Sequence, residues 1–425
     1  MEVRNYPELK ESLLWEVLPN GLNVAIVPRP GFTRKLCYFV TDFGSIHTEF
    51  SMDGKGYTLP AGIAHYLEHK LFDMPGRDVS AEFAALGASV NAFTSYDMTA
   101  YHFSCTEHFP EALRLLLECV STPYFTPETV AKEQGIIGQE IGMNEDTPET
   151  RIFEQLMEAM YRTHPVKEPI LGTVESISRI TPENLTLCHR AFYRPDNMLL
   201  CIVGDVDARQ VMQIAMECVP NAPAEQVTAT RQWHEDMTCP KDFVSCNMEV
   251  AMPTFQLGFK CPPLQRGEEA VRREIVGELA AEVLFGEASA LYLKLYEQGL
   301  IDASFGGGFE TIDGMAMLLC SGDSDDPEAV REAVLQQAEK LSREGVDTEA
   351  FLRMKRSAFG RRVRDLDSFD STCFRLCAYE LSGYDYFDFP ALYERIEKEE
   401  IQEFLRRVVR TERCSLSVIR PLEEE

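Results

Sequence analysis

The sequence predicts an α+β protein built from two homologous sandwich halves, in each of which helices cover one face of a mostly antiparallel sheet. Two observations support this prediction. Strand-like segments followed by long amphipathic helices are typical of this fold class. The second half of the chain also repeats the element order of the first. A chain of 425 residues with 45% hydrophobic residues is long enough to bury more than one core.

The first half begins with a predicted β-hairpin. Residues 14–18 and 22–27 are apolar-rich segments that flank Pro19-Asn-Gly, and an Asn-Gly pair between two such runs is a strong hairpin signal. A predicted helix follows, with Pro60 in its first turn. The later elements are a strand and hairpin over 87–105, helices over 110–119 and 126–144, and a helix followed by a strand over 180–203.

The second half repeats these later elements. Residues 302–320 match 87–105, a helix opening with Pro327-Glu-Ala-Val matches the one opening with Pro110-Glu-Ala-Leu, and 396–419 matches 180–203. We therefore predict one domain over residues 1–222 and a homologous domain over 241–425. The polar segment 223–240 between them has little periodicity and is predicted to be a linker.

The most informative motif is H-x-x-E-H, formed by His65, Glu68 and His69. On a helix these three positions share one face, and the pattern is the inverse of the common zinc-protease signature. The surrounding residues are apolar nearly all round, so polar side chains there are costly unless they are paired. The motif predicts a zinc site with a base beside it. The alternative is two core histidines bonded to backbone carbonyls, with a glutamate that reaches solvent.

A hydrolytic zinc site needs a third protein ligand, which we expect from the helix over 126–144. Thr126 suits its N-cap, Pro127 its first helical position, and Glu133 and Glu140 fall on or beside its apolar stripe. Either glutamate alone could belong to a solvated helix face. The stripe is formed by Val130, Ile137 and Ile141.

Glycines recur in the same helix at positions 135, 138 and 142. Because a helix does not keep three glycines without cost, we expect them to admit the close approach of another backbone, such as the helix that carries His65.

Several blocks of the first half together resemble the pitrilysin/insulinase zinc peptidases, the inverzincins. These blocks are the H-x-x-E-H motif and the segments 87–95 with Tyr101, 172–178, 192–198 and 202–205. The resemblance implies a zinc-dependent endopeptidase that hydrolyses peptides or small unfolded proteins. It also implies that the two halves form half of a clamshell.

The resemblance assigns roles to individual residues. It implies that His65, His69 and Glu140 bind one Zn²⁺ per chain, that Glu68 is the general base, and that Glu133 is a supporting acid. A peptide substrate would add as a strand at the sheet edge formed by Asn91, Ala92 and Phe93, where main-chain hydrogen bonds provide binding.

The second half departs from the family pattern. Its positions matching Glu133 and Glu140 are Met354 and Arg361, and all eight histidines of the chain lie at or before His234. Many family members also carry there an Arg and a Tyr, seven residues apart, that hold the substrate carbonyl. Leu295, with Tyr296 beside it, and Asp302 occupy those positions here.

This departure resembles the zinc-bearing subunit of two-component bacterial members. We expect a dimer, either a homo-oligomer or a heterodimer with a zinc-free paralogue that supplies the missing pair. The alternative function is a non-catalytic or partner-dependent subunit of a processing complex that retains a zinc site.

Composition excludes other classes of protein. The net charge of −28 disfavours nucleic acid and anionic membranes as partners, since phosphates attract Lys and Arg clusters. No run approaches 18 apolar residues, and residues 1–10 are polar and carry charges of both signs, unlike a signal peptide. We expect a cytoplasmic protein whose thirteen cysteines stay reduced.

Overall fold

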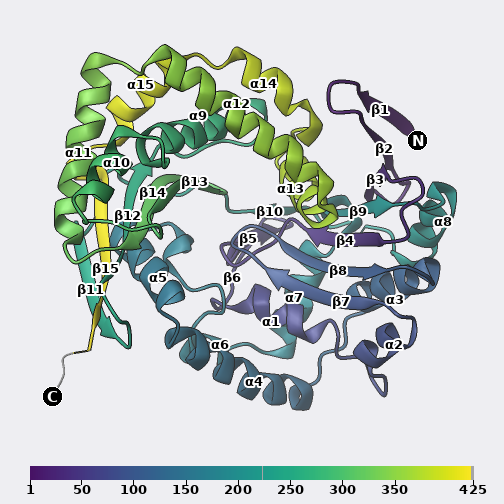
Figure 1. The fold of residues 1–425 in the computed structure, drawn as a ribbon. Coiled ribbons are helices and arrows are strands. Elements are labelled where there is room, and N and C mark those ends of the chain that lie inside the picture. Colours follow the sequence, from purple (N-terminus) through teal and green to yellow (C-terminus); the bar gives the residue numbers. More distant parts are fainter. Residues whose placement is uncertain (223, 423–425) are drawn as a thin grey trace. The chain divides into compact units, whose positions relative to one another are not determined.

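The computed structural model describes residues 1–222 and 224–422, which form two compact units (Figure 1). Each unit collects separate stretches of the chain. The first unit contains Met1–Ile141, Pro169–Thr230 and Val363–Asp388, and the second contains Gly142–Glu168, Arg231–Arg362 and the residues from Phe389 onward. The domain boundaries predicted from the sequence stay a prediction. Residue 223, where the predicted linker begins, and residues 423–425, where the predicted second domain ends, lie outside the described residues.

The main sheet of the first unit has the strand order β1-β2-β3-β9-β4-β8-β7. Strands β3 and β9 are parallel, and the other neighbours are antiparallel. The predicted hairpin joins β2 to β3, with Gly21 in the left-handed conformation that its turn requires. The strands are β1 (Glu2–Tyr6), β2 (Glu11–Val17), β3 (Asn23–Pro28), β4 (Lys35–Thr41), β7 (Ser89–Thr94), β8 (Thr99–Cys105) and β9 (Met198–Gly204).

Helices pack on both faces of this sheet. One face forms the main core with α1, α3 and α7, where Phe39 and Phe103 are fully buried. Helix α13 packs on the opposite face of β9 and β4, where Cys201 and Cys373 lie with their sulfur atoms 3.9 Å apart. The helices are α1 (Ile63–Lys70), α2 (Val79–Ala85), α3 (Phe109–Ser121), α4 (Pro127–Glu145), α6 (Val174–Ile177), α7 (Pro182–Phe192), α8 (Ala208–Cys218) and α13 (Phe369–Leu381).

The sheet of the second unit repeats the topology of the first. Its order β11-β15-β12-β14-β13 corresponds to β3-β9-β4-β8-β7, again with the first pair parallel and the others antiparallel. The predicted duplication and the α+β sandwich class are therefore confirmed. The strands are β11 (Phe243–Met248), β12 (Thr254–Cys261), β13 (Gly306–Ile312), β14 (Met315–Asp323) and β15 (Cys414–Pro421).

Helices also pack on both faces of the second sheet. Helices α9, α11 and α15 pack on one face, and α5 packs on β15, β12 and β11 from the other. The Ser417 hydroxyl donates to the Ile152 carbonyl of α5 at 2.8 Å, and a Cβ at Gly258 would lie 2.5 Å from Met160 Sδ. The helices are α5 (Pro148–Met160), α9 (Glu268–Phe285), α10 (Ala290–Glu297), α11 (Pro327–Glu344), α12 (Thr348–Arg364), α14 (Phe389–Arg395) and α15 (Lys398–Val408).

Helices α5 and α13 are exchanged between the two halves of the sequence. Helix α5 follows α4 along the chain but packs on the sheet of the second unit, whereas α13 follows α12 but packs on the sheet of the first. The prediction that helices cover one face of each sheet therefore misses one helix in each unit. None of the helices in the described residues is long and apolar enough to cross a bilayer.

The segment predicted to be a linker has structure on both sides of residue 230. Strand β10 (Val227–Ala229) adds to β5 (Glu49–Met52), which pairs with β6 (Lys55–Thr58) in a small sheet of the first unit. In the second unit, the Glu235 carboxylate accepts hydrogen bonds from the backbone N–H groups of Arg162 and Thr163 at 2.8 and 2.7 Å.

Candidate metal centre

Helix α1 carries the H-x-x-E-H motif and begins at Ile63, three residues later than Pro60. Gly62 stands before it with φ 87°, and a Cβ there would lie 2.3 Å from the carbonyl oxygen of Leu171. The chain before α6 therefore closes directly on the start of the helix, which requires glycine at this position. The prediction of a buried helix is confirmed, since seven of the eight residues of α1 are buried.

Helix α4 begins at Pro127 as predicted, and the Thr126 hydroxyl accepts a hydrogen bond from the Thr129 N–H at 3.2 Å. Its predicted apolar stripe is buried, with Val130, Ile137 and Ile141 between 0 and 6% exposed. The Tyr66 hydroxyl of α1 donates to the Val130 carbonyl. This hydrogen bond joins the two helices. Glu133 and Glu140 of α4 lie beside the face of α1 that carries the histidines.

His65, His69 and Glu140 come together at the junction of α1 and α4. His65 Nε2 lies 3.6 Å from Glu140 Oε1, and His69 Nε2 lies 3.5 Å from Glu140 Oε2. Two ligand atoms that each bind a tetrahedral zinc ion at about 2.0–2.1 Å lie about 3.4 Å from each other. The distances between the histidine nitrogens and the Glu140 oxygens therefore fit zinc. Among the described residues this is the one group of three or more His, Cys, Asp or Glu whose ligand atoms all lie within 4.8 Å.

Glu133 contacts the centre through a histidine. Its Oε1 lies 3.0 Å from His69 Nδ1, which leaves His69 Nε2 directed at Glu140. Although burial acts in the opposite direction, the hydrogen bond with Glu133 raises the pKa of His69. A carboxylate bonded to the second ring nitrogen is the usual way to orient a metal-binding histidine.

Glu68 lies beside the two histidines and is 9% exposed. Burial raises the pKa of its carboxyl group above the ordinary value, while the Thr94 hydroxyl, which donates to Glu68 Oε2 at 2.8 Å, and the two imidazoles oppose the rise. The pKa of Glu140 is lowered instead, first by its hydrogen bond with His65. The environments of the two carboxyl groups therefore shift their pKa values in opposite directions. This difference suits Glu68 as a base and Glu140 as a metal ligand.

Strand β7, which carries Asn91, Ala92 and Phe93, is the last strand at its end of the sheet order within the described residues. The Ala92 N–H donates to Asn91 Oδ1 at 2.9 Å. Because alternate residues of an edge strand turn their N–H groups away from the neighbouring strand, this bond marks Ala92 as one that faces the open edge. Phe93 points to the other face of the sheet from Ala92, where its ring lies 6.0 Å from that of Phe374.

Ion pairs replace this ligand set in the second unit. Arg361, at the position on α12 that matches Glu140 on α4, donates to Glu282 Oε2 of α9 at 2.7 Å. The neighbouring Arg362 donates to Glu278 Oε1 at 2.8 Å. Salt bridges therefore join α9 to α12 where α1 and α4 bring together the candidate metal ligands.

The residues at the positions expected for the Arg and the Tyr have structural roles in this protein. Leu295 is fully buried in α10, and Tyr296 is 54% exposed and stacks on Tyr292 at 5.8 Å. The Asp302 carboxylate accepts hydrogen bonds from the N–H and hydroxyl groups of Ser304 at 2.7 and 2.5 Å. A buried leucine and a carboxylate that accepts hydrogen bonds cannot donate to a substrate carbonyl.

The prediction for the three glycines of α4 is wrong. A Cβ added at Gly135, Gly138 or Gly142 would meet nothing within 4 Å, so no other backbone approaches them closely among the described residues. They lie away from the buried stripe that faces α1. Their presence in the helix has no packing explanation in the structure.

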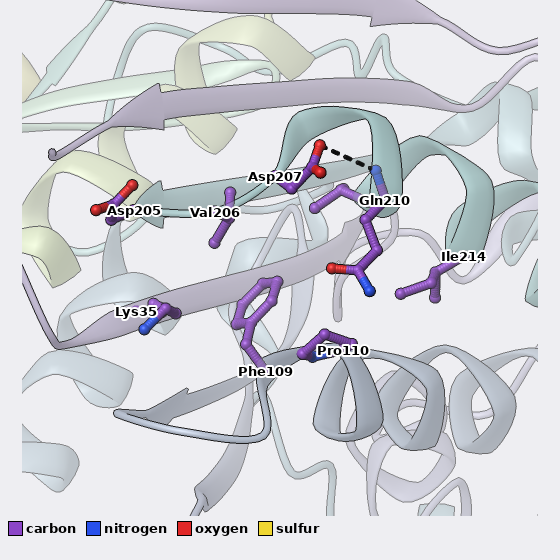
Figure 2. Close-up of a pocket in the computed structure, with 9 residues that line it drawn as sticks. Lys35, Phe109, Pro110, Asp205, Val206, Asp207, Gln210 and Ile214 are labelled. Atoms are coloured by element: carbon purple, nitrogen blue, oxygen red, sulfur yellow. Dashed lines mark hydrogen bonds between the residues drawn. The ribbon is translucent and has the colours of Figure 1, made fainter.

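A small pocket lies elsewhere in the first unit (Figure 2). It has a volume of about 130 Å³, and three of its charged side chains form hydrogen bonds with the surrounding backbone. Asp207 accepts from the Gln210 N–H at the start of α8, Asp205 accepts from the Gly31 N–H, and Lys35 donates to the Thr106 carbonyl. These contacts stabilise the loops around β9.

Thr94, which donates to Glu68, is not among the site residues that the sequence predicts. The available signal was its position two residues after Ala92, because alternate residues of a strand share one face. What could not be foreseen was that this face of β7 meets α1.

Two family models match the chain. Residues 58–174 match the model described as insulinase, peptidase family M16, and residues 179–358 match the peptidase M16 inactive domain. The first match contains the candidate metal centre. Most of the second match falls in the sequence half that has no counterpart of the histidine ligands.

Whole-chain relatives agree with these matches. An uncharacterized zinc protease of Bacillus subtilis strain 168, YmfH, is 36% identical over 425 residues, which cover 98% of each chain. An uncharacterized zinc protease of Rickettsia felis is 25% identical over 287 residues, or 65% of each chain. Among solved structures, a putative M16-like peptidase from Alicyclobacillus acidocaldarius superposes with a TM-score of 0.92 at 32% identity, covering 97% of this chain and 99% of that one.

Proposed function

This chain belongs to the insulinase family of peptidases, family M16, and on that premise we propose that it is a zinc-dependent endopeptidase. Its substrates are peptides or small unfolded proteins. The observation that carries the proposal is the convergence of His65, His69 and Glu140, with ligand atoms within 4.8 Å of one another, beside the buried carboxylate of Glu68. A centre with two imidazoles, one carboxylate and an adjacent base is the donor set of a hydrolytic zinc site.

When bound, zinc supplies a Lewis acid that polarises a peptide carbonyl and makes a water molecule acidic near neutral pH. Glu68 takes the proton from the attacking water and passes it to the leaving amine nitrogen. Glu133 keeps His69 oriented through the 3.0 Å contact with Nδ1. The peptide adds along β7 and binds through the backbone of Ala92 and the side chain of Asn91, which without a peptide are joined by the hydrogen bond from the Ala92 N–H to Asn91 Oδ1.

A partner-dependent function is the second candidate, and a specific observation favours it. Leu295 is buried and Asp302 is an acceptor for Ser304, so neither can hold the carbonyl oxygen of a substrate. The chain then works with a zinc-free paralogue that carries the donors, or it serves as a subunit of a processing complex that retains zinc.

Metal analysis tests the ligand assignment. We expect one zinc per molecule in the purified chain, and a loss of most of this zinc from His65→Ala and His69→Ala, because each substitution removes one of three protein ligands. His234→Ala, at a histidine outside the centre, is the matched control and should keep its zinc. Unchanged zinc content in His65→Ala or His69→Ala would refute the assignment.

Glutamine substitutions separate the two glutamates of α4. Glu140→Gln should nearly abolish zinc binding, whereas Glu133→Gln should weaken it by about 10- to 100-fold, as expected for a group that orients a ligand. Zinc affinity measured by competition with a chelator gives the ranking. A larger loss in Glu133→Gln would exchange the two assignments.

A further inference from the structure

Thr94 contacts the base of the candidate centre. It is the last residue of β7, and its hydroxyl donates to Glu68 Oε2 at 2.8 Å. We propose that Thr94 is a positioning residue that holds the Glu68 carboxylate so that its other oxygen, Oε1, is presented for proton transfer. This inference rests on the proposed peptidase function and adds to it a residue that links the substrate-binding strand to the base.

A glutamate carboxylate that acts as a base needs a hydrogen bond that fixes the direction of its oxygens. The terminal torsion of glutamate has a broad, roughly two-fold preference, so a carboxylate without a partner can turn its oxygens freely. Threonine is stiff at χ1 because it is branched at Cβ, and a hydroxyl on a strand is therefore a well-directed donor. Glu68 is also 9% exposed, and a buried charge that lost this hydrogen bond would be costly to keep.

The place of Thr94 on β7 connects this hydrogen bond to substrate binding. Side chains two residues apart share a face of a strand, so Thr94 lies on the face of Ala92 that packs toward the core containing α1. A peptide that adds along the open edge of β7 lies on the strand whose last residue, Thr94, donates to Glu68 through its side chain and not through its backbone. Loss of the Thr94 hydroxyl should therefore slow turnover, while the backbone groups that bind the peptide stay in place.

The kinetic test uses Thr94→Val, which keeps the shape and removes the donor, and Thr94→Ser, which keeps the donor. Thr99→Val is the matched control, because Thr99 pairs with Thr94 across the hairpin and its hydroxyl donates to the Phe43 carbonyl at 2.8 Å. We expect kcat of Thr94→Val to fall about 10- to 100-fold, the factor of a hydrogen bond to a charged group, with KM and zinc content unchanged. Thr94→Ser should recover most of kcat, and Thr99→Val should keep it.

A second measurement needs no bound metal. In the metal-free chain, urea unfolding of Thr94→Val, Glu68→Ala and the double variant forms a double-mutant cycle, in which alanine at position 68 can no longer accept the hydrogen bond of Thr94. Because the two side chains form one hydrogen bond, we expect the double variant to change the unfolding equilibrium constant about 10-fold less than the two single variants combined. Additive effects, or a Thr94→Ser enzyme as slow as Thr94→Val, would overturn the positioning role.

The two hypotheses fail in different ways. If the unaltered chain hydrolyses no peptide, alone or with its paralogue, the proposed function fails and the positioning role fails with it, even if the cycle shows coupling. If the unaltered chain hydrolyses peptides and Thr94→Val matches its kcat, the positioning role alone is wrong.

Discussion

Glu68→Gln is expected to lower peptide turnover by about 100-fold or more while zinc content and fold stay unchanged. A positioned general base contributes at least about that factor, and an amide cannot accept the proton of the attacking water. The side chain is isosteric and can still accept the Thr94 hydrogen bond through its carbonyl oxygen. The loss should therefore appear in kcat and not in stability.

Hydrolysis of an unstructured peptide and metal analysis of the same samples test this expectation. Glu128→Gln, an exposed glutamate in the first turn of α4, is the matched control and should behave like the unaltered chain. Loss of zinc from Glu68→Gln would make Glu68 a ligand. Turnover equal to that of the control would exclude Glu68 as the base.

The second large effect concerns the partner. The chain alone is expected to be a weak peptidase, and a zinc-free paralogue that carries the Arg and Tyr should raise its turnover by about 100- to 1000-fold. This is the usual cost of losing one donor to the developing oxyanion. A second copy of this chain cannot repair the deficit, because it would present another buried Leu295 and another Asp302 bonded to Ser304.

Titration of the paralogue into a fixed amount of this chain measures the effect. The matched control is the same paralogue with its Arg changed to Leu and its Tyr to Phe, which should bind but not activate. Restoring the donor within this chain is a poor test, because Leu295→Arg would place a charge at a fully buried position. Full turnover by the chain alone, unaltered by the paralogue, would contradict the expectation and point to a local donor such as Tyr296.

Short-range patterns predicted the elements that build the site. The spacing of His65, Glu68 and His69 placed them on one helix face, and the capping pattern at Thr126 and Pro127 located the start of α4. The repeated segments predicted the matching sheets of the two units. Each of these features depends on residues close together in the sequence, or on a comparison of the chain with itself.

Features that depend on contacts between distant segments were missed. Periodicity shows that α5 and α13 each have an apolar face, but it does not show which sheet covers that face. The sequence predicts Pro60 in the first turn of α1, but the helix begins at Ile63, because nothing local reveals that the carbonyl of Leu171 closes on Gly62. The spacing of the α4 glycines indicated a contact, yet the buried stripe that packs against α1 lies on another side of the helix.

Peptide hydrolysis by this chain is proposed to depend on a single zinc ion held by His65, His69 and Glu140. Zinc titration into the metal-free chain, with hydrolysis of an unstructured peptide as the readout and the paralogue present throughout, is the measurement that decides this. Activity should rise in proportion to added zinc, stop at one equivalent per chain, and fail to appear in His65→Ala. Undiminished hydrolysis by the metal-free chain, or equal recovery in His65→Ala, would contradict the proposal.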